Sequence, residues 1–178
     1  MFDLNEIAGL PAHPLLLHVP VVLIPILSGA TIALMVRPDW RRRYGPAVAA
    51  LGLVALIFTI LAASAGEAFR ASRPIFASPA LNEHAELGDQ LKAVMVLFVG
   101  ALVVFLAADL KRGPRALDKL AQLLHHPGME RFARIGISVL AVVALVWVAR
   151  TGHEGAEVAW SQPSPLHQQS HVAALKPH

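Results

Sequence analysis

Four long apolar stretches dominate this chain and leave only polar linkers between them. They cover about residues 14–36, 46–66, 88–109 and 133–151. Because about twenty apolar residues in a helix cross the hydrocarbon core of a bilayer, each stretch is long enough to be a membrane span. The chain is also 56% hydrophobic and only 15% charged, which is unusually apolar for a soluble domain. We therefore expect an all-α polytopic membrane protein, an antiparallel bundle of four transmembrane helices within residues 1–160.

Basic residues concentrate in two of the three linkers, and this distribution predicts the orientation. The first linker contains Arg37, Arg41, Arg42 and Arg43, and the third contains Lys111, Arg112, Arg115, Lys119, Arg131 and Arg134. Basic linkers stay on the cytoplasmic side of a membrane, so both termini are expected outside. Since the charge clusters beside the spans, the net charge of +3 does not indicate a nucleic-acid partner.

The remaining segments are less apolar. Leucines at helical spacing predict a short interfacial helix at about 115–126, and the polar segment 161–178 is expected to be a loosely ordered tail. Asp3 and Glu6 precede the first stretch, which is therefore expected to remain a membrane helix rather than a cleaved signal peptide. The chain has no cysteine, which excludes disulfides, thiolate metal sites and cysteine nucleophiles.

Histidines and carboxylates gather where the spans meet the outer face. They are His13 and His18 before and within the first span, Glu67 after the second, His84 before the third, and His153 and Glu157 after the fourth. The topology brings these positions to one side of the membrane. Ionisable side chains at such depth usually have a functional reason, although polar residues at headgroup level are the simpler explanation for each one alone.

The spacing within each motif suggests how these side chains are directed. His13 and His18 are five residues apart and cannot share a face of a regular helix. Pro14 allows His13 to lie in the preceding loop, and we expect His18 to point into the bundle. His153 and Glu157 are four residues apart and share a face. Glu157 is therefore a candidate to ligate a metal or to orient the His153 imidazole. Glu67, at the outer end of the second span, is a candidate for the same two roles.

The sequence motifs P-A-H-P-L-L-L-H-V-P, S-A-G-E, H-A-E-L-G-D and T-G-H-E-G-A-E resemble a bacterial family of membrane proteins, domain of unknown function 2231. The resemblance covers about residues 9–160. It implies a four-helix protein of the bacterial inner (cytoplasmic) membrane without an assigned activity. Some members of that family are fused to Rieske or cytochrome c domains, which implies a redox neighbourhood.

Three functions remain open at this point. The first is a haem b-binding electron-transfer or redox accessory module, with His18 and either His84 or His153 as axial ligands and a quinol or an extracytoplasmic redox protein as partner. The second is a non-haem site for Zn, Fe or Cu, formed by His18, His84 and His153 with Glu67 or Glu157. The third is an accessory membrane subunit without a cofactor. No catalytic residues are identified, and the protein is not expected to be an enzyme by itself.

Overall fold

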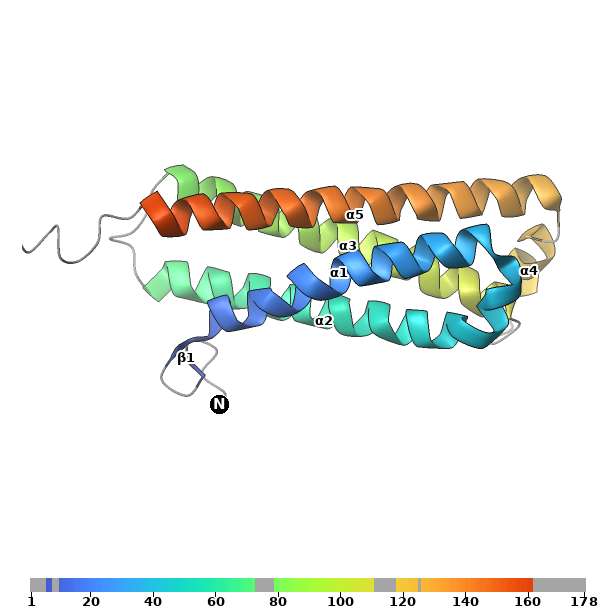
Figure 1. Ribbon diagram of the computed structural model, residues 1–178, viewed down its shortest axis with the longest axis horizontal. Helices are drawn as coiled ribbons and strands as arrows, with labels where there is room; N and C mark the ends of the chain where they lie inside the picture. Colours follow the sequence, from blue (N-terminus) through green and yellow to red (C-terminus); the bar gives the residue numbers. More distant parts are fainter. Residues whose placement is uncertain (1–5, 8–9, 73–78, 111–117, 125, 162–178) are drawn as a thin grey trace, which may run out of the picture.

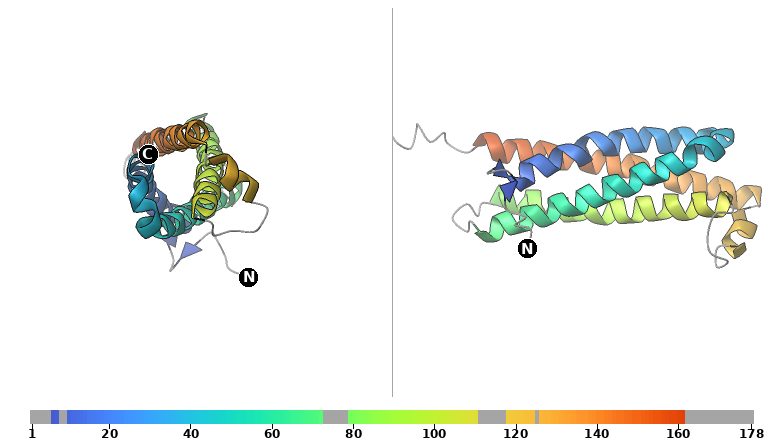
Figure 2. Two further views of the ribbon diagram at one scale, coloured as in Figure 1. Left: turned by 90° about the vertical axis from the view of Figure 1, so that its right-hand side faces the viewer. Right: turned by 90° about the horizontal axis from the view of Figure 1, so that it is seen from below.

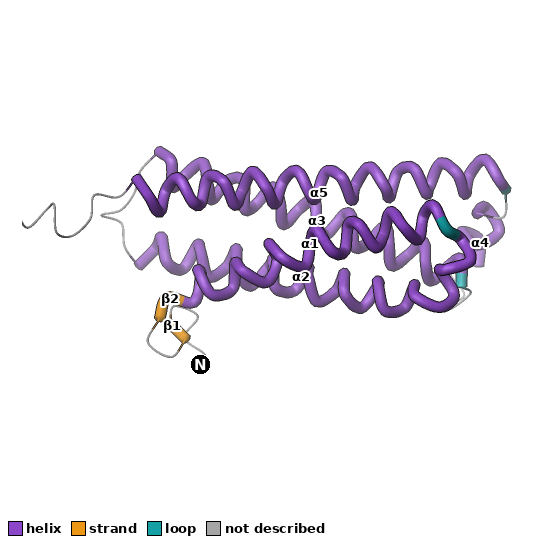
Figure 3. The backbone as a smooth tube through the Cα atoms, in the orientation of Figure 1, coloured by secondary structure: helices purple, strands orange, loops and turns teal. Residues whose placement is uncertain are grey.

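The computed structural model describes residues 6–7, 10–72, 79–110, 118–124 and 126–161. Four long helices form an antiparallel bundle: α1 (Ala12–Val36), α2 (Arg41–Ser72), α3 (Pro79–Asp109) and α5 (Pro127–Ser161) (Figure 1). The 3-10 helix η1 (Pro38–Trp40) connects α1 to α2, and the short helix α4 (Asp118–Leu124) precedes α5. Strands β1 (Glu6–Ile7) and β2 (Leu10–Pro11) form a minimal antiparallel pair before α1 (Figure 3).

All four long helices are long and apolar enough to cross a membrane, as the sequence predicts. Large apolar side chains are exposed on each of them, for example Val22, Ile57, Leu97 and Val139. Exposed apolar surface on every helix is what a lipid-facing bundle requires, whereas a soluble bundle would place polar residues there. The exposed surface of the bundle is therefore that of a membrane protein.

Three of the helices extend well beyond the predicted spans. α2 begins at Arg41 rather than near 46, α3 begins at Pro79 rather than near 88, and α5 continues to Ser161 rather than ending near 151. The apolar stretch marks only the part of a helix that lies in hydrocarbon, while Glu, Gln, Arg and Ala continue a helix readily in water. His84 and His153 consequently lie within helices, where the helical register fixes their directions.

The helices are arranged as a ring in which each long helix packs against two neighbours. α1 and α3 each contact α2 and α5, and they occupy opposite corners when the bundle is viewed along its axis (Figure 2). Because successive long helices run in opposite directions, α1 and α3 run in the same direction. Positions on these two helices can therefore be compared for depth along the bundle.

The buried core is contributed by all four helices and includes Ile24, Leu27, Ala55, Met95, Phe98, Leu102, Ala141 and Ala144. Gly52 on α2 is a point of close approach. A Cβ atom at Gly52 would lie 3.4 Å from Val99 Cγ1 and 3.5 Å from Leu27 Cδ1. Leu27 of α1 and Val99 of α3 thus lie at the same depth, on either side of Gly52.

Candidate functional site

The two ends of the bundle differ in the side chains that they bring together. We call the end where α1 and α3 begin and α2 and α5 finish the histidine end, and the opposite end the arginine end. Figure 1 shows the histidine end on the left, next to the β1–β2 pair, and the arginine end on the right, next to α4. Every candidate site residue from the sequence belongs to the histidine end.

His84 is the candidate that packs between helices. It lies in the second turn of α3, on the face that continues through the buried residues Leu91 and Met95. Its imidazole is half-buried against α5, and a Cβ atom built on Gly155 would lie 2.9 Å from His84 Cε1. Any side chain larger than glycine at position 155 would therefore press on the imidazole ring.

His153 and Glu157 face outward from α5. The buried positions of this helix are Ile137, Ala141, Ala144, Val148 and Thr151, and the same register continues to Gly155. His153 is about 200° around the helix from Thr151, since each residue turns about 100°. Its side chain is 73% exposed, and its Nε2 lies 3.3 Å from Oε1 of Glu157, which is itself 63% exposed. The two residues share a face, as predicted, but that face is directed away from His84.

The first helix changes the expectation for His18. His18 is exposed, so the prediction that it points into the bundle is not supported. The buried positions Pro20, Leu27 and Leu34 recur every seven residues, and the same register placed one heptad earlier falls on position 13. His13 is also not in a preceding loop, because α1 already begins at Ala12. Its side chain lies outside the described part of the structure.

Positions 13 and 84 are at matching depth on opposite helices. His13 is fourteen residues before Leu27, and His84 is fifteen residues before Val99. Leu27 and Val99 flank the same glycine, and both helices rise about 1.5 Å per residue in the same direction. The two histidine positions therefore fall within about one residue of each other along the bundle axis.

The other two helices place small residues at this depth. α2 runs in the opposite direction, and fourteen residues after Gly52 it reaches Gly66. Ala62 and Ala65, on the same helix, are buried. With Gly155 on α5, these helices present small side chains at the histidine end, as they also do at Ala55, Ala141 and Ala144 in the central core.

Glu67 is exposed at the end of this small-residue segment of α2. Its charge interacts with Lys92 of α3, whose Nζ lies 2.8 Å from Oδ1 of Asp89. Glu67 and Asp89 thus both contribute negative charge near Lys92.

The candidate side chains that the structure describes do not form a metal site. Among the described residues, no group of three or more His, Asp or Glu side chains is placed to hold a metal ion. Of the other histidines, His126 is exposed at the arginine end. His125, His167, His171 and His178 lie outside the described residues.

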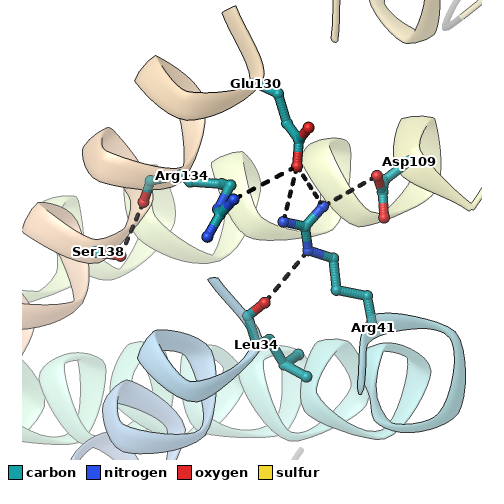
Figure 4. A network of polar contacts seen from close by, with 6 residues as sticks. All are labelled: Leu34, Arg41, Asp109, Glu130, Arg134 and Ser138. Carbon is teal, nitrogen blue, oxygen red and sulfur yellow. Dashed lines mark hydrogen bonds and ion pairs between the residues drawn. The ribbon is translucent and has the colours of Figure 1, made fainter. Parts of the chain in front are cut away.

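The arginine end contains a polar network that the sequence alone does not reveal. Arg41, one of the basic residues of the first linker, is only 2% exposed. Its Nη1 lies 3.2 Å from Asp109 Oδ1 on α3, and both Nη atoms lie 3.0 Å from Glu130 Oε1 on α5 (Figure 4). Its Nε donates to the carbonyl oxygen of Leu34 on α1 at 3.3 Å. One side chain of α2 therefore contacts the other three long helices.

Two further contacts complete the network. The guanidinium carbon of Arg41 lies 5.0 Å from the ring centroid of Phe105, and Arg134 Nη1 lies 3.9 Å from Glu130 Oε1. Two arginines thus balance two carboxylates in a partly buried site. Asp109 is the last residue of α3, and Glu130 lies in the first turn of α5, so the two carboxylates flank the linker between these helices.

Comparisons with known proteins agree with this architecture. A family model described as "Predicted membrane protein (DUF2231)" matches residues 9–163. No curated protein matches the chain, and no solved structure does. Because the family model covers most of the sequence, the chain belongs to the DUF2231 family of predicted membrane proteins.

Proposed function

We propose that this protein is a membrane-embedded haem b-binding module, in which His84 of α3 and His13 of α1 would hold the haem. Haem supplies one-electron transfer when it is bound by two neutral imidazoles. Bundle proteins commonly form such sites from side chains on facing helices. The observation that supports the proposal is the half-buried imidazole of His84, which packs against Gly155 at the depth of position 13 on the opposite helix.

The residues around this pair suit a flat, apolar cofactor. Haem would need narrow side chains on the helices beside it, and α2 and α5 present Ala62, Ala65 and Gly155 at this depth. The same two helices also carry small residues in the middle of the bundle, so the feature that supports a ligand site at the histidine end is the half-buried imidazole of His84.

The proposal changes the ligand assignment made from sequence alone. His18 and His153 are exposed, so neither would hold the haem in this proposal. The outward His153–Glu157 pair instead belongs to the surface that meets a redox partner. If the basic linkers are cytoplasmic, the histidine end faces away from the cytoplasm, and the partner is a quinol or an extracytoplasmic redox protein.

A reduced-minus-oxidised absorption spectrum of the protein purified in detergent, with metal analysis of the same sample, tests the proposal. We expect a Soret band with one iron per chain. His13→Ala and His84→Ala should each abolish or strongly shift the band, whereas the matched changes His18→Ala and His153→Ala should leave it. Loss of the band in His18→Ala or His153→Ala, with retention in His84→Ala, would refute the assignment of ligands.

A second function is favoured by the exposed pair on α5. Partnered polar side chains on the outer surface of a membrane helix are typical of contacts with another subunit. A featureless spectrum without bound metal would support an accessory membrane subunit that docks through His153 and Glu157. Stoichiometric Zn, Cu or non-haem iron without a Soret band would instead support the non-haem metal site.

A further inference from the structure

The turn between α1 and α2 combines exposed arginines with aromatic rings. It has the sequence R-P-D-W-R-R-R-Y at residues 37–44. Arg41 is used internally, as described above, whereas Arg37, Arg42 and Arg43 are exposed. Of the four arginines in this turn, one therefore holds the helices together and three lie at the surface.

The two aromatic residues hold two of these arginines in place. The guanidinium carbon of Arg37 lies 5.3 Å from the ring centroid of Trp40, and that of Arg43 lies 5.3 Å from the ring of Tyr44. The two rings meet edge to face, with centroids 5.9 Å apart and planes at 73°. Each aromatic side chain is 43% exposed, so the cluster is accessible from outside the bundle.

The guanidinium groups keep their hydrogen-bond donors available. Within the described residues, Arg37, Arg42 and Arg43 form no ion pair, and Asp39 is the one carboxylate in this segment. Stacking on a ring occupies the face of a guanidinium and leaves its in-plane N–H groups free to bind an anion. The planar fork of arginine matches the oxygens of a phosphate.

The location of the cluster identifies the kind of phosphate. Val36, the last residue of α1, is 65% exposed and directly precedes Arg37. The lipid-facing surface of α1 thus leads straight to the arginines, with Trp40 and Tyr44 at the level where such rings mark the membrane–water interface. A molecule bound here would place an apolar chain along α1 and an anionic head among the arginines.

We infer that Arg37, Arg42 and Arg43, with Trp40 and Tyr44, form a binding surface for the headgroup phosphate of an anionic phospholipid. This surface is at the arginine end and is independent of the proposed haem site. The bound lipid neutralises charges that would otherwise repel one another at the turn, and it anchors α1 and α2 at the interface.

Native mass spectrometry of the full chain, released from detergent with equal amounts of phosphatidylglycerol and phosphatidylcholine of identical acyl chains, tests the inference. We expect the wild type to retain phosphatidylglycerol several-fold over phosphatidylcholine. Arg37→Gln/Arg42→Gln/Arg43→Gln should reduce this preference by about fivefold or more, since one basic residue near an anionic surface is worth about that factor. Inorganic phosphate in excess should not displace the retained lipid.

A charge-matched variant separates specific binding from net charge. Lys119→Gln/Arg131→Gln/Arg150→Gln removes three exposed positive charges elsewhere and should keep the preference. Equal retention of both lipids by the wild type, equal losses in both triple variants, or displacement by inorganic phosphate would each overturn the inference. If the Arg37/Arg42/Arg43 variant does not fold, Arg42→Gln alone tests the inference, because Arg42 contacts neither ring in the cluster. The readout is again the retention of phosphatidylglycerol relative to phosphatidylcholine, which should fall below that of the wild type.

Discussion

The imidazole of His84 on α3 lies directly against Gly155 on α5, so close that a Cβ atom at position 155 would be 2.9 Å from Cε1. This contact fixes the spacing of α3 and α5 at the histidine end. It also couples the proposed haem ligand to a position that has no functional group of its own. The glycine is needed for the shape of the site rather than for its chemistry.

Gly155→Ala should therefore displace the His84 ring or separate the two helices. Overpacking of this kind costs about 1–3 kcal/mol, so we expect a lower midpoint in thermal unfolding in detergent. If haem is bound, its Soret band should shift as well. Gly152→Ala is the control, because a Cβ atom there meets nothing within 4 Å. Alanine in a helix is about 0.5–1 kcal/mol more favourable than glycine, so this variant should be unchanged or more stable.

Removal of Arg41 should be among the most destabilising changes in the chain. Arg41→Ala leaves Asp109 and Glu130 facing each other without their shared partner, at a cost of about 3 kcal/mol or more. The neighbouring change Arg42→Ala removes an exposed arginine and should lie within about 0.5 kcal/mol of the wild type. Unfolding in detergent compares the two. Similar stabilities of Arg41→Ala and Arg42→Ala would contradict a structural role for the network.

Two hydroxyls on the buried face of α1 should respond in opposite directions. Ser28 Oγ donates to the carbonyl oxygen of Ala141 on α5 at 3.0 Å, whereas Thr31 Oγ1 is buried and has no hydrogen-bond partner among the described residues. Ser28→Ala should lower the free energy of unfolding by about 0.6 kcal/mol, a typical value for such bonds between membrane helices. Thr31→Val keeps the shape and removes an unsatisfied hydroxyl, so it should be neutral or stabilising.

The absence of cysteine makes the orientation easy to test. Gln122→Cys on α4 and Ala156→Cys on α5 each place a single thiol at an exposed position, at the arginine end and the histidine end respectively. A membrane-impermeant maleimide added to spheroplasts should label Cys at 156 and should label Cys at 122 only after lysis. The reverse pattern would invert the predicted topology and place the histidine end in the cytoplasm.

The four helices could be predicted from the sequence because a membrane span requires about twenty consecutive apolar residues, and hydropathy detects such stretches directly. It did not predict how far the helices continue, since polar residues such as those at 79–87 and 152–161 extend a helix without an apolar signal. The outward direction of the His153 side chain could have been predicted from the sequence. The small and apolar residues at 141, 144, 148 and 151 define the inward-facing positions of α5, and the next inward-facing position is Gly155 rather than His153.

The Arg41 network was not predictable by the same reasoning. The positive-inside rule treats every arginine at a helix end as a solvated charge, so it assigns Arg41 and Arg42 the same role. Which of two adjacent arginines turns inward depends on tertiary neighbours, here Asp109 and Glu130, which are separated from Arg41 by more than sixty residues. Pairings over that distance leave no local pattern in a single sequence.

Fastening all four helices through one arginine at one end has a consequence for assembly. The relative order of the four long helices is set there by the contacts of Arg41 with α1, α3 and α5. Correct alignment of the whole bundle therefore depends on a single residue that lies far from every histidine candidate.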